Sequence, residues 1–192
     1  MSSLVIILLA IHILSGTISL LSALGAMLCK KGFYWHRVFG RFFIYAMTAI
    51  FITAVPLALI KNNLFLFLIA FFSYYLAFSG WRFAKNRSGI PSKIDWTASG
   101  LMLFVGIFMI SFGIYHFDSS NYQKIVILIF GVIGTTSSVS DMKIYLARKA
   151  TGTERIIKHL SGMLGATIAA TTAFAVTNIH TGPCLLYTSD AA

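Results

Sequence analysis

The sequence predicts an all-α fold, a polytopic bundle of transmembrane helices, and three observations carry that prediction. Hydrophobic residues make up 58% of the 192 residues, charged residues only 10%, and the mean hydropathy is +0.85. The apolar residues fall in continuous runs close to the roughly 20 residues with which a helix crosses a bilayer. Lys and Arg stand between these runs rather than in one patch. A soluble globule, which carries about 25% charged residues, does not fit this composition.

Six apolar runs are long enough, or nearly so, to cross a membrane, and short polar turns separate them. The Lys61-Asn62-Asn63 turn ends the second run, and a turn rich in Asp, Ser and Asn ends the fourth. The runs are too long, and too little alternating in polarity, for the strands of a membrane barrel. The connections are short, so consecutive helices are expected to be antiparallel neighbours. The predicted spans are 4–28, 42–60, 64–83, 96–115, 125–145 and 160–177, within a single domain of residues 1–183.

The first predicted helix carries no Lys or Arg before its apolar run. A cleaved secretory signal has a basic start and a shorter apolar core, so this run is predicted to remain in the membrane as a helix. Small and polar residues recur along it at helical spacing, from His12 to Ala26. Because small residues mark contact faces between membrane helices, this stripe is predicted to pack against a neighbour.

The other five helices differ in the size of their side chains. The second and third are rich in Phe and Leu and are expected to face lipid, with Pro56 kinking the second near its end. Asp95 precedes the fourth and is expected to cap its N-terminus. The fifth carries two glycines three residues apart, and the sixth pairs Gly162 with Ala166. The first, fifth and sixth helices are therefore expected to form the inner core.

The basic residues predict the orientation of the chain. Of its 15 Lys and Arg residues, all but Lys61 and Lys124 follow the first, third or fifth run. Lys and Arg stay in the cytoplasm, so the N-terminus is predicted to lie outside a bacterial inner membrane. The lipid bilayer is the predicted partner. No RNA- or DNA-binding motif accompanies the positive charge, so nucleic-acid binding is not predicted, and protein partners stay undefined.

His12 is the only ionisable residue well inside a predicted span. An ionisable side chain in the membrane is by default a hypothesis of function. The structural alternative is a neutral imidazole that is hydrogen-bonded to a Ser, Thr or carbonyl of a neighbouring helix. The functional alternatives are ligation of a metal or haem and handling of protons, because an imidazole titrates near neutral pH.

A second group of polar residues lies at the predicted cytoplasmic end of the bundle, where it is a candidate functional cluster. Its structural alternative is interfacial anchoring, in which Arg and His meet lipid phosphate. For Asp141, which is placed near the end of the fifth helix, that alternative is a salt bridge to Lys143 or Arg155. His159 is expected to begin the sixth helix. The candidate residues of this cluster are His36, Arg37, Arg41, Asp141 and His159.

Three functions stay open. The first is a multi-pass inner-membrane protein, of an activity that the sequence does not define, centred on His12 and the cytoplasmic cluster. The second is a redox protein that holds b-type haem, with His12, His36 and His159 as candidate ligands. Haem in a helix bundle needs histidines that face each other at one depth. Four of the five His lie at predicted helix ends, which weakens this hypothesis. The third is a small proton-linked transporter that uses His12.

Motifs that would name a reaction are missing. The sequence contains no Gly-x-Gly-x-x-Gly, Walker, His-Glu-x-x-His or Cys-x-x-Cys pattern and no serine nucleophile elbow. No separate metal site is predicted, catalytic residues are undefined, and enzymatic activity stays undecided. The last residues, Cys184 to Ala192, resemble the translation of a sequencing adapter and are expected to be a non-native tail.

Several short motifs in a fixed order resemble a bacterial family of predicted membrane proteins, catalogued as domain of unknown function 2306, or a near relative of it. The resemblance covers nearly the whole chain to Asn178. It implies a membrane helix bundle with no established activity, and a seventh helix that this chain has lost by truncation. The motifs are His12-Ile-Leu-Ser-Gly16, His36-Arg-x-x-Gly40, Ser79-Gly-Trp-Arg82, Asp95-Trp96, Phe130-Gly-x-x-Gly134 with Asp141, His159-Leu-x-x-Met163 and Ala173-Phe-x-Val-x-Asn178.

Overall fold

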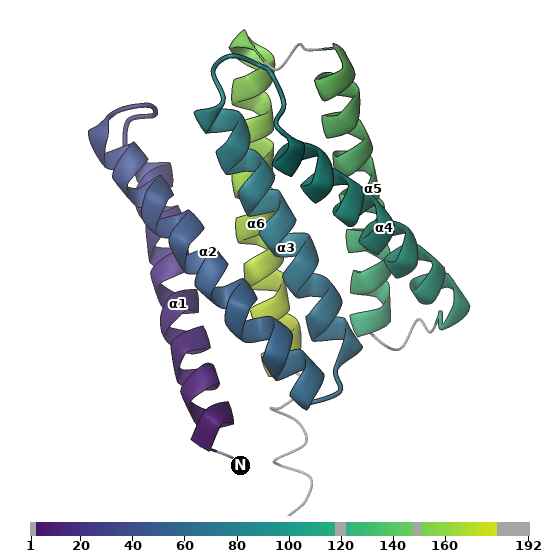
Figure 1. The fold of residues 1–192 in the computed structure, drawn as a ribbon. Helices are drawn as coiled ribbons and strands as arrows, with labels where there is room; N and C mark the ends of the chain where they lie inside the picture. Colours follow the sequence, from purple (N-terminus) through teal and green to yellow (C-terminus); the bar gives the residue numbers. More distant parts are fainter. Residues whose placement is uncertain (1–2, 118–121, 148–150, 180–192) are drawn as a thin grey trace, which may run out of the picture.

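A computed structural model describes residues 3–117, 122–147 and 151–179, and within these residues the chain is helical with no strand (Figure 1). The predicted tail at 184–192 lies outside the described residues. All six helices are long and apolar enough to cross a membrane, as predicted. They are α1 (Ser3–Leu28), α2 (Tyr34–Ile60), α3 (Leu64–Lys85), α4 (Lys93–Tyr115), α5 (Tyr122–Ala147) and α6 (Gly152–Ile179).

Two helices begin about two turns earlier than the hydropathy pattern predicts. Helix α2 starts at Tyr34 rather than residue 42, and α6 starts at Gly152 rather than residue 160. The added turns are rich in Arg, Lys and His, which lower the hydropathy without opposing a helix. Such side chains extend their charged ends towards water while the helical backbone satisfies its own hydrogen bonds. His159 therefore lies two turns inside α6 rather than at its beginning, which corrects the expectation.

The expected inner core is wrong, because α3 and not α1, α5 or α6 is the central helix. The closest helix pairs are α1 with α2, α3 with α6 and α4 with α5, and α3 also packs on α2, α4 and α5. Helix α3 runs through the middle of the bundle in Figure 1. Its Phe and Leu residues alternate with small residues such as Ala70, Ser73 and Ala77, all buried, so that large and small side chains interlock with four neighbours.

Helix α1 packs mainly on α2 and leaves much of its surface to the surroundings. Its stripe of small residues is buried as predicted, at Ser15, Ser19, Ser22 and Ala23. The opposite face exposes large apolar side chains, including Leu14 and Leu21. Lipid tails are as apolar as leucine, so an exposed leucine face costs nothing in a membrane, and contact is concentrated where small side chains let the backbones approach.

The tightest backbone approach joins α3 to α6 at two glycines. A Cβ atom placed on Gly162 would lie 2.7 Å from the Gly80 Cα atom and 2.7 Å from the Leu76 carbonyl oxygen. Backbone cannot give way as a flexible side chain can, so this crossing needs residues without side chains. It brings the first two turns of α6 against the end of α3.

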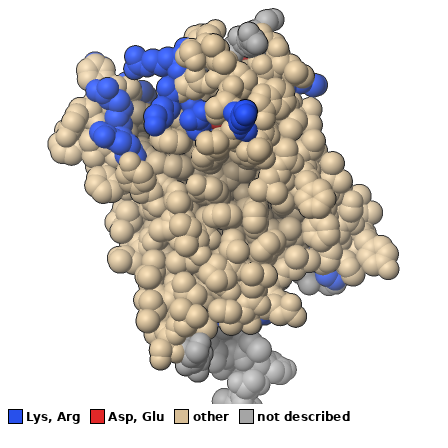
Figure 2. Space-filling model, in the orientation of Figure 1, with Lys and Arg blue, Asp and Glu red and all other residues tan. Residues whose placement is uncertain are grey.

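The Lys and Arg side chains gather at one end of the bundle, as Figure 2 shows. We call it the basic end; it holds the α1–α2 and α3–α4 connections, residues 29–33 and 86–92. Two ion pairs, Arg82 with Asp95 and Lys158 with Asp141, lie near this end. The Lys61 turn, which joins α2 to α3, lies at the opposite end (Figure 1). This one-sided distribution is the pattern that orients multi-pass proteins in membranes.

Replacement of Gly162 by Ala should destabilise the bundle by about 1–3 kcal/mol, the usual cost of overpacking a tight contact. Thermal unfolding in detergent measures the change. Gly16→Ala is the matched control, because a Cβ on Gly16 meets no atom within 4 Å and alanine favours a helix over glycine by about 1 kcal/mol. Equal unfolding temperatures for the two variants would show that the α3–α6 contact is loose.

Candidate functional site

Two histidines from different halves of the bundle meet near the basic end. His36 lies in the first turn of α2, and His159 lies two turns into α6. Their ring centroids are 6.2 Å apart and their ring planes are nearly perpendicular, at 88°. Both side chains are half-buried. The pair therefore spans the space between the α1–α2 hairpin and the α3–α6 pair, which otherwise touch through α2 on α3 and a few contacts of α1 with α6.

Each of the two rings is held by a backbone carbonyl on its Nδ1 side. His36 Nδ1 lies 3.0 Å from the Ala26 carbonyl oxygen of α1, and His159 Nδ1 lies 2.9 Å from the Gly80 carbonyl oxygen of α3. A carbonyl only accepts hydrogen bonds, so Nδ1 carries the hydrogen in both rings. In the neutral imidazole Nε2 then keeps its lone pair, on the side of the ring away from the carbonyl. The two rings are fixed in the tautomer that can bind an electrophile or a metal through Nε2.

A buried carboxylate lies beside this pair. Asp141 of α5 is 3% exposed and accepts three hydrogen bonds from side chains of α3 and α6. Lys158 Nζ donates to Oδ1 at 2.8 Å, while the Tyr75 hydroxyl at 2.8 Å and the Ser79 hydroxyl at 2.5 Å donate to Oδ2. Lys158 also donates to Ser140 of α5 at 2.7 Å. Asp141 therefore forms a salt bridge, as its structural alternative held, but with Lys158 rather than with Lys143 or Arg155.

The carboxylate and the imidazole pair are held by adjacent residues. In α3, Ser79 binds Asp141 and the next residue, Gly80, binds His159 through its carbonyl. In α6, Lys158 binds Asp141 and the next residue is His159 itself. Neighbouring residues of a helix point about 100° apart. One turn of α3 and one turn of α6 can therefore hold the Asp141 carboxylate on one side and the His159 imidazole on another. A displacement of one group would be transmitted to the other over a single residue.

A second ion pair closes the α3–α4 connection. Arg82 Nε and Nη2 donate to the two carboxylate oxygens of Asp95 at 2.5 and 2.8 Å, a bidentate arrangement. Asp95, 3% exposed, also accepts from the Ser92 backbone N–H at 2.7 Å, at the N-terminus of α4. Asp95 thus takes part in the N-terminal cap of α4, as the sequence suggested, and additionally neutralises Arg82.

His12 has a local partner in the neighbouring helix. Its Nδ1 lies 3.0 Å from Thr53 Oγ1, and this hydroxyl itself donates to the Ala49 carbonyl at 2.8 Å. Thr53 Oγ1 is therefore the acceptor and His12 Nδ1 the donor. The half-buried imidazole makes the interhelical bond that was the structural alternative for it, and it fastens α1 to α2.

The structure brings together only part of the predicted cluster. His36 and His159 are in ring contact, and Asp141 lies beside them through adjacent residues. Arg37 and Arg41 are exposed, and Arg41 Nε makes a long 3.4 Å contact with the Arg37 carbonyl. Their places on the exposed surface of α2 leave them near the pair in sequence but outside the buried network.

Three residues that bind Asp141 are not predicted from the sequence as part of the cluster: Lys158, Tyr75 and Ser79. In the sequence Lys158 is one of the charges that orient the chain, Tyr75 lies in a helix expected to face lipid, and Ser79 stands out only as the first residue of the motif Ser79-Gly-Trp-Arg82. The available signal was that Ser79 lies four residues after Tyr75, so both fall on one helix face.

The residues that could hold a cofactor are the two imidazoles. Among the described residues, no group of three or more His, Cys, Asp or Glu side chains converges on one point. A bare metal ion usually takes four or more protein or water ligands. The donor set of two imidazoles is instead the number of axial ligands of a haem iron, whose other ligands belong to the macrocycle.

No family model matches this chain, and neither a curated protein nor a solved structure matches it.

Removal of Lys158 alone should destabilise the protein by about 3 kcal/mol, because it leaves a buried carboxylate without its counter-charge. We therefore expect Lys158→Met to lower the unfolding temperature in detergent clearly more than Lys143→Met, which removes an exposed lysine from α5. The double variant Asp141→Asn with Lys158→Met should recover most of the loss, since an amide oxygen still accepts from Tyr75 and Ser79. Additive losses in the double variant would show that the two charges do not interact.

Proposed function

We propose that this protein is a multi-pass membrane redox protein that binds one b-type haem between His36 and His159. The single observation that carries the proposal is the preorganised pair of imidazoles. The two rings lie close together, with their centroids 6.2 Å apart, so that His36 and His159 could hold one iron between them.

The hydrogen bonds of the two rings support the same proposal. Histidines that bind metals almost always donate their other ring N–H to a carbonyl or a carboxylate, which fixes the tautomer and the orientation of the ring. Both imidazoles meet this condition through Ala26 and Gly80. His159 lies two turns inside α6, whereas His36 lies in the first turn of α2, so only one of the two histidines departs from the helix-end position expected from the sequence.

The charge around the pair also suits haem, whose two propionates are anionic. Arg37 follows His36 directly, Arg41 follows one turn later in α2, and Arg155 precedes His159 by one turn in α6. Guanidinium groups bind carboxylates through charge-assisted hydrogen bonds. When bound, haem supplies a one-electron couple between ferric and ferrous iron. His36 and His159 would hold it at the basic end of the bundle, with their rings oriented by the Ala26 and Gly80 carbonyls.

We further infer the cellular setting from the same features that predicted it. The one-sided positive charge supports a bacterial inner membrane with the basic end in the cytoplasm and the N-terminus outside. The ordered motifs support membership of the family of domain of unknown function 2306. The haem would then lie near the cytoplasmic face, within reach of electron carriers on that side or in the bilayer.

The absorption spectrum of the purified protein tests the haem proposal. We expect about one haem per chain, with a Soret band that shifts on reduction, and near-complete loss of that band in His36→Ala and in His159→Ala. The matched control is His116→Ala, which removes an exposed imidazole from the end of α4 and should leave the spectrum unchanged. A colourless preparation after growth with added haem precursor would refute the proposal.

The orientation has its own test in intact cells. Single cysteines are placed at Asn62 and at Arg87, in a background where Cys29 and Cys184 are serine. A membrane-impermeant thiol reagent should label the cysteine at residue 62 and spare the one at residue 87, because the two connections lie at opposite ends of the bundle. Equal labelling of both positions would contradict a fixed transmembrane orientation.

A further inference from the structure

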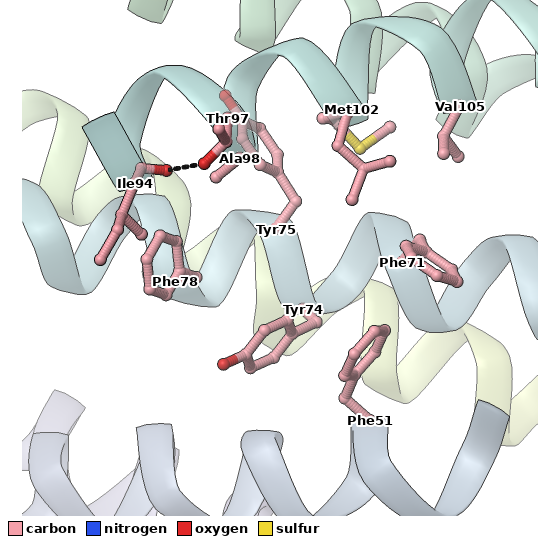
Figure 3. Close-up of a pocket in the computed structure, with 11 residues that line it drawn as sticks. Phe51, Phe71, Tyr74, Tyr75, Phe78, Ile94, Thr97, Ala98, Met102 and Val105 are labelled. Atoms are coloured by element: carbon pink, nitrogen blue, oxygen red, sulfur yellow. Dashed lines mark hydrogen bonds between the residues drawn. The ribbon is translucent and has the colours of Figure 1, made fainter. Parts of the chain in front are cut away.

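A pocket of about 250 Å³ lies on the other side of α3 from the imidazole pair, between α2, α3 and α4 (Figure 3). Its lining belongs to the membrane-spanning parts of these helices. Figure 3 shows Phe71, Tyr74 and Phe78 of α3 between Phe51 of α2 and the first turns of α4. The remaining lining residues are Tyr75, Ile94, Thr97, Ala98, Leu101, Met102 and Val105.

The walls of this pocket are flat. Phe51 and Tyr74 are stacked with centroids 4.6 Å apart and planes within 13°, and Phe51 meets Phe71 edge to face at 5.0 Å. Offset-stacked and edge-to-face contacts are the arrangements in which aromatic rings attract one another. The pocket is smaller than the roughly 300–1,000 Å³ that holds a drug-sized ligand. Its shape and size suit a single planar ring with short substituents.

Polar atoms at the pocket allow for a ring that carries oxygen atoms. The Tyr74 hydroxyl makes only a long contact with the Thr48 hydroxyl, at 3.4 Å, and so keeps capacity for a stronger hydrogen bond. The Thr97 hydroxyl donates to the Ile94 carbonyl at 3.0 Å and can still accept a hydrogen bond. Most of the lining is apolar, and the Tyr74 and Thr97 hydroxyls, on residues that line the pocket, are the groups that could bond a ring with carbonyl or hydroxyl substituents.

The entrance of the pocket faces the bilayer. Ile94 and Leu101 of α4 are exposed on the surface of the bundle and line the pocket at the same time. Since this surface belongs to spanning segments, a ligand reaches it through lipid and must itself dissolve in lipid.

Helix α3 alone separates this pocket from the imidazole pair. Phe78 lines the pocket, and Gly80, two residues later, binds His159 through its carbonyl. An α-helix with its side chains is about 10–12 Å across, so the two sites lie about that far apart. Tyr75 gives a second link, since its ring lines the pocket while its hydroxyl donates to Asp141.

We propose that this pocket binds the ring of a lipid-soluble quinone or quinol, the electron partner of the haem. The proposal rests on the proposed function for the use of the site, but the pocket itself does not depend on haem. If haem is bound, oxidation of one quinol to one quinone would break two O–H bonds, release two protons and deliver one electron to the haem of each of two chains. A benzoquinone and a naphthoquinone share the required chemistry.

The test uses the full chain in detergent with added phospholipid, and two readouts. The first is the rate at which a short-chain benzoquinol or a short-chain naphthoquinol reduces the haem. The second is photolabelling by an azido derivative of each quinone, which does not depend on haem. Ala98→Trp fills the pocket from α4, and Ala10→Trp places the same side chain on the exposed surface of α1 as the matched control.

We expect Ala98→Trp to lower both the reduction rate and the labelling at least tenfold, while Ala10→Trp changes neither. Reduction by dithionite and the unfolding temperature should stay as in the parent chain, which shows that haem and fold are intact. The quinol that reacts faster identifies the natural class. Tyr74→Phe, which keeps the ring but removes the hydroxyl, should weaken labelling several-fold.

The outcomes separate this proposal from the haem proposal. Labelling of α2, α3 or α4 that is lost in Ala98→Trp supports the pocket even in a colourless protein, which would refute only the haem. A haem spectrum without saturable labelling overturns the pocket proposal and leaves the haem proposal intact. Labelling that excess phospholipid abolishes would show that acyl chains fill the pocket, which also overturns the proposal.

Discussion

The contact between α3 and α6 at Gly80 and Gly162 is the constraint on which the polar structure depends. This close approach lies one turn from His159, whose Nδ1 donates to the Gly80 carbonyl, and near Lys158, which donates to the carboxylate of Asp141 in α5. In a lipid environment each of these polar groups needs a partner inside the protein. One crossing of two small residues therefore positions an imidazole and an ion pair at the same time, and links both to the central helix.

Most of the fold follows from the sequence because the bilayer imposes it. A run of apolar residues must be a helix in lipid, so the number and order of the six helices follow from hydropathy. The arrangement of the helices does not. Small residues predict the interior at α1, α5 and α6, yet Gly162 on α6 lies against α3, and the large side chains of α3 fill the space between four neighbours. Residue size indicates that a face is in contact, but not which helix becomes the centre.

The sequence predicts where in the bundle the candidate site lies, but not which contacts form it. The alternation of the spans predicts that His36 and His159 lie at the same end of the bundle, and the structure puts their rings in contact. The partners that fix them are backbone carbonyls, which every residue carries and which no pattern of side chains reveals. Lys158 and Tyr75 were overlooked for a similar reason. A lysine near a membrane surface and a tyrosine in an aromatic helix have common explanations, and only their convergence on Asp141 distinguishes them.

The loose attachment of the α1–α2 hairpin has a consequence for biogenesis. The hairpin meets the other four helices mainly through α2 on α3, and the imidazole pair crosses the remaining space near the basic end. A ligand that bridges the two rings would join the hairpin of α1 and α2 to the unit of α3 to α6. The last contact of the folded bundle would then form when the cofactor binds rather than during translation. Chains without the cofactor would leave the space between the hairpin and the other helices open, and membrane proteases would degrade them faster.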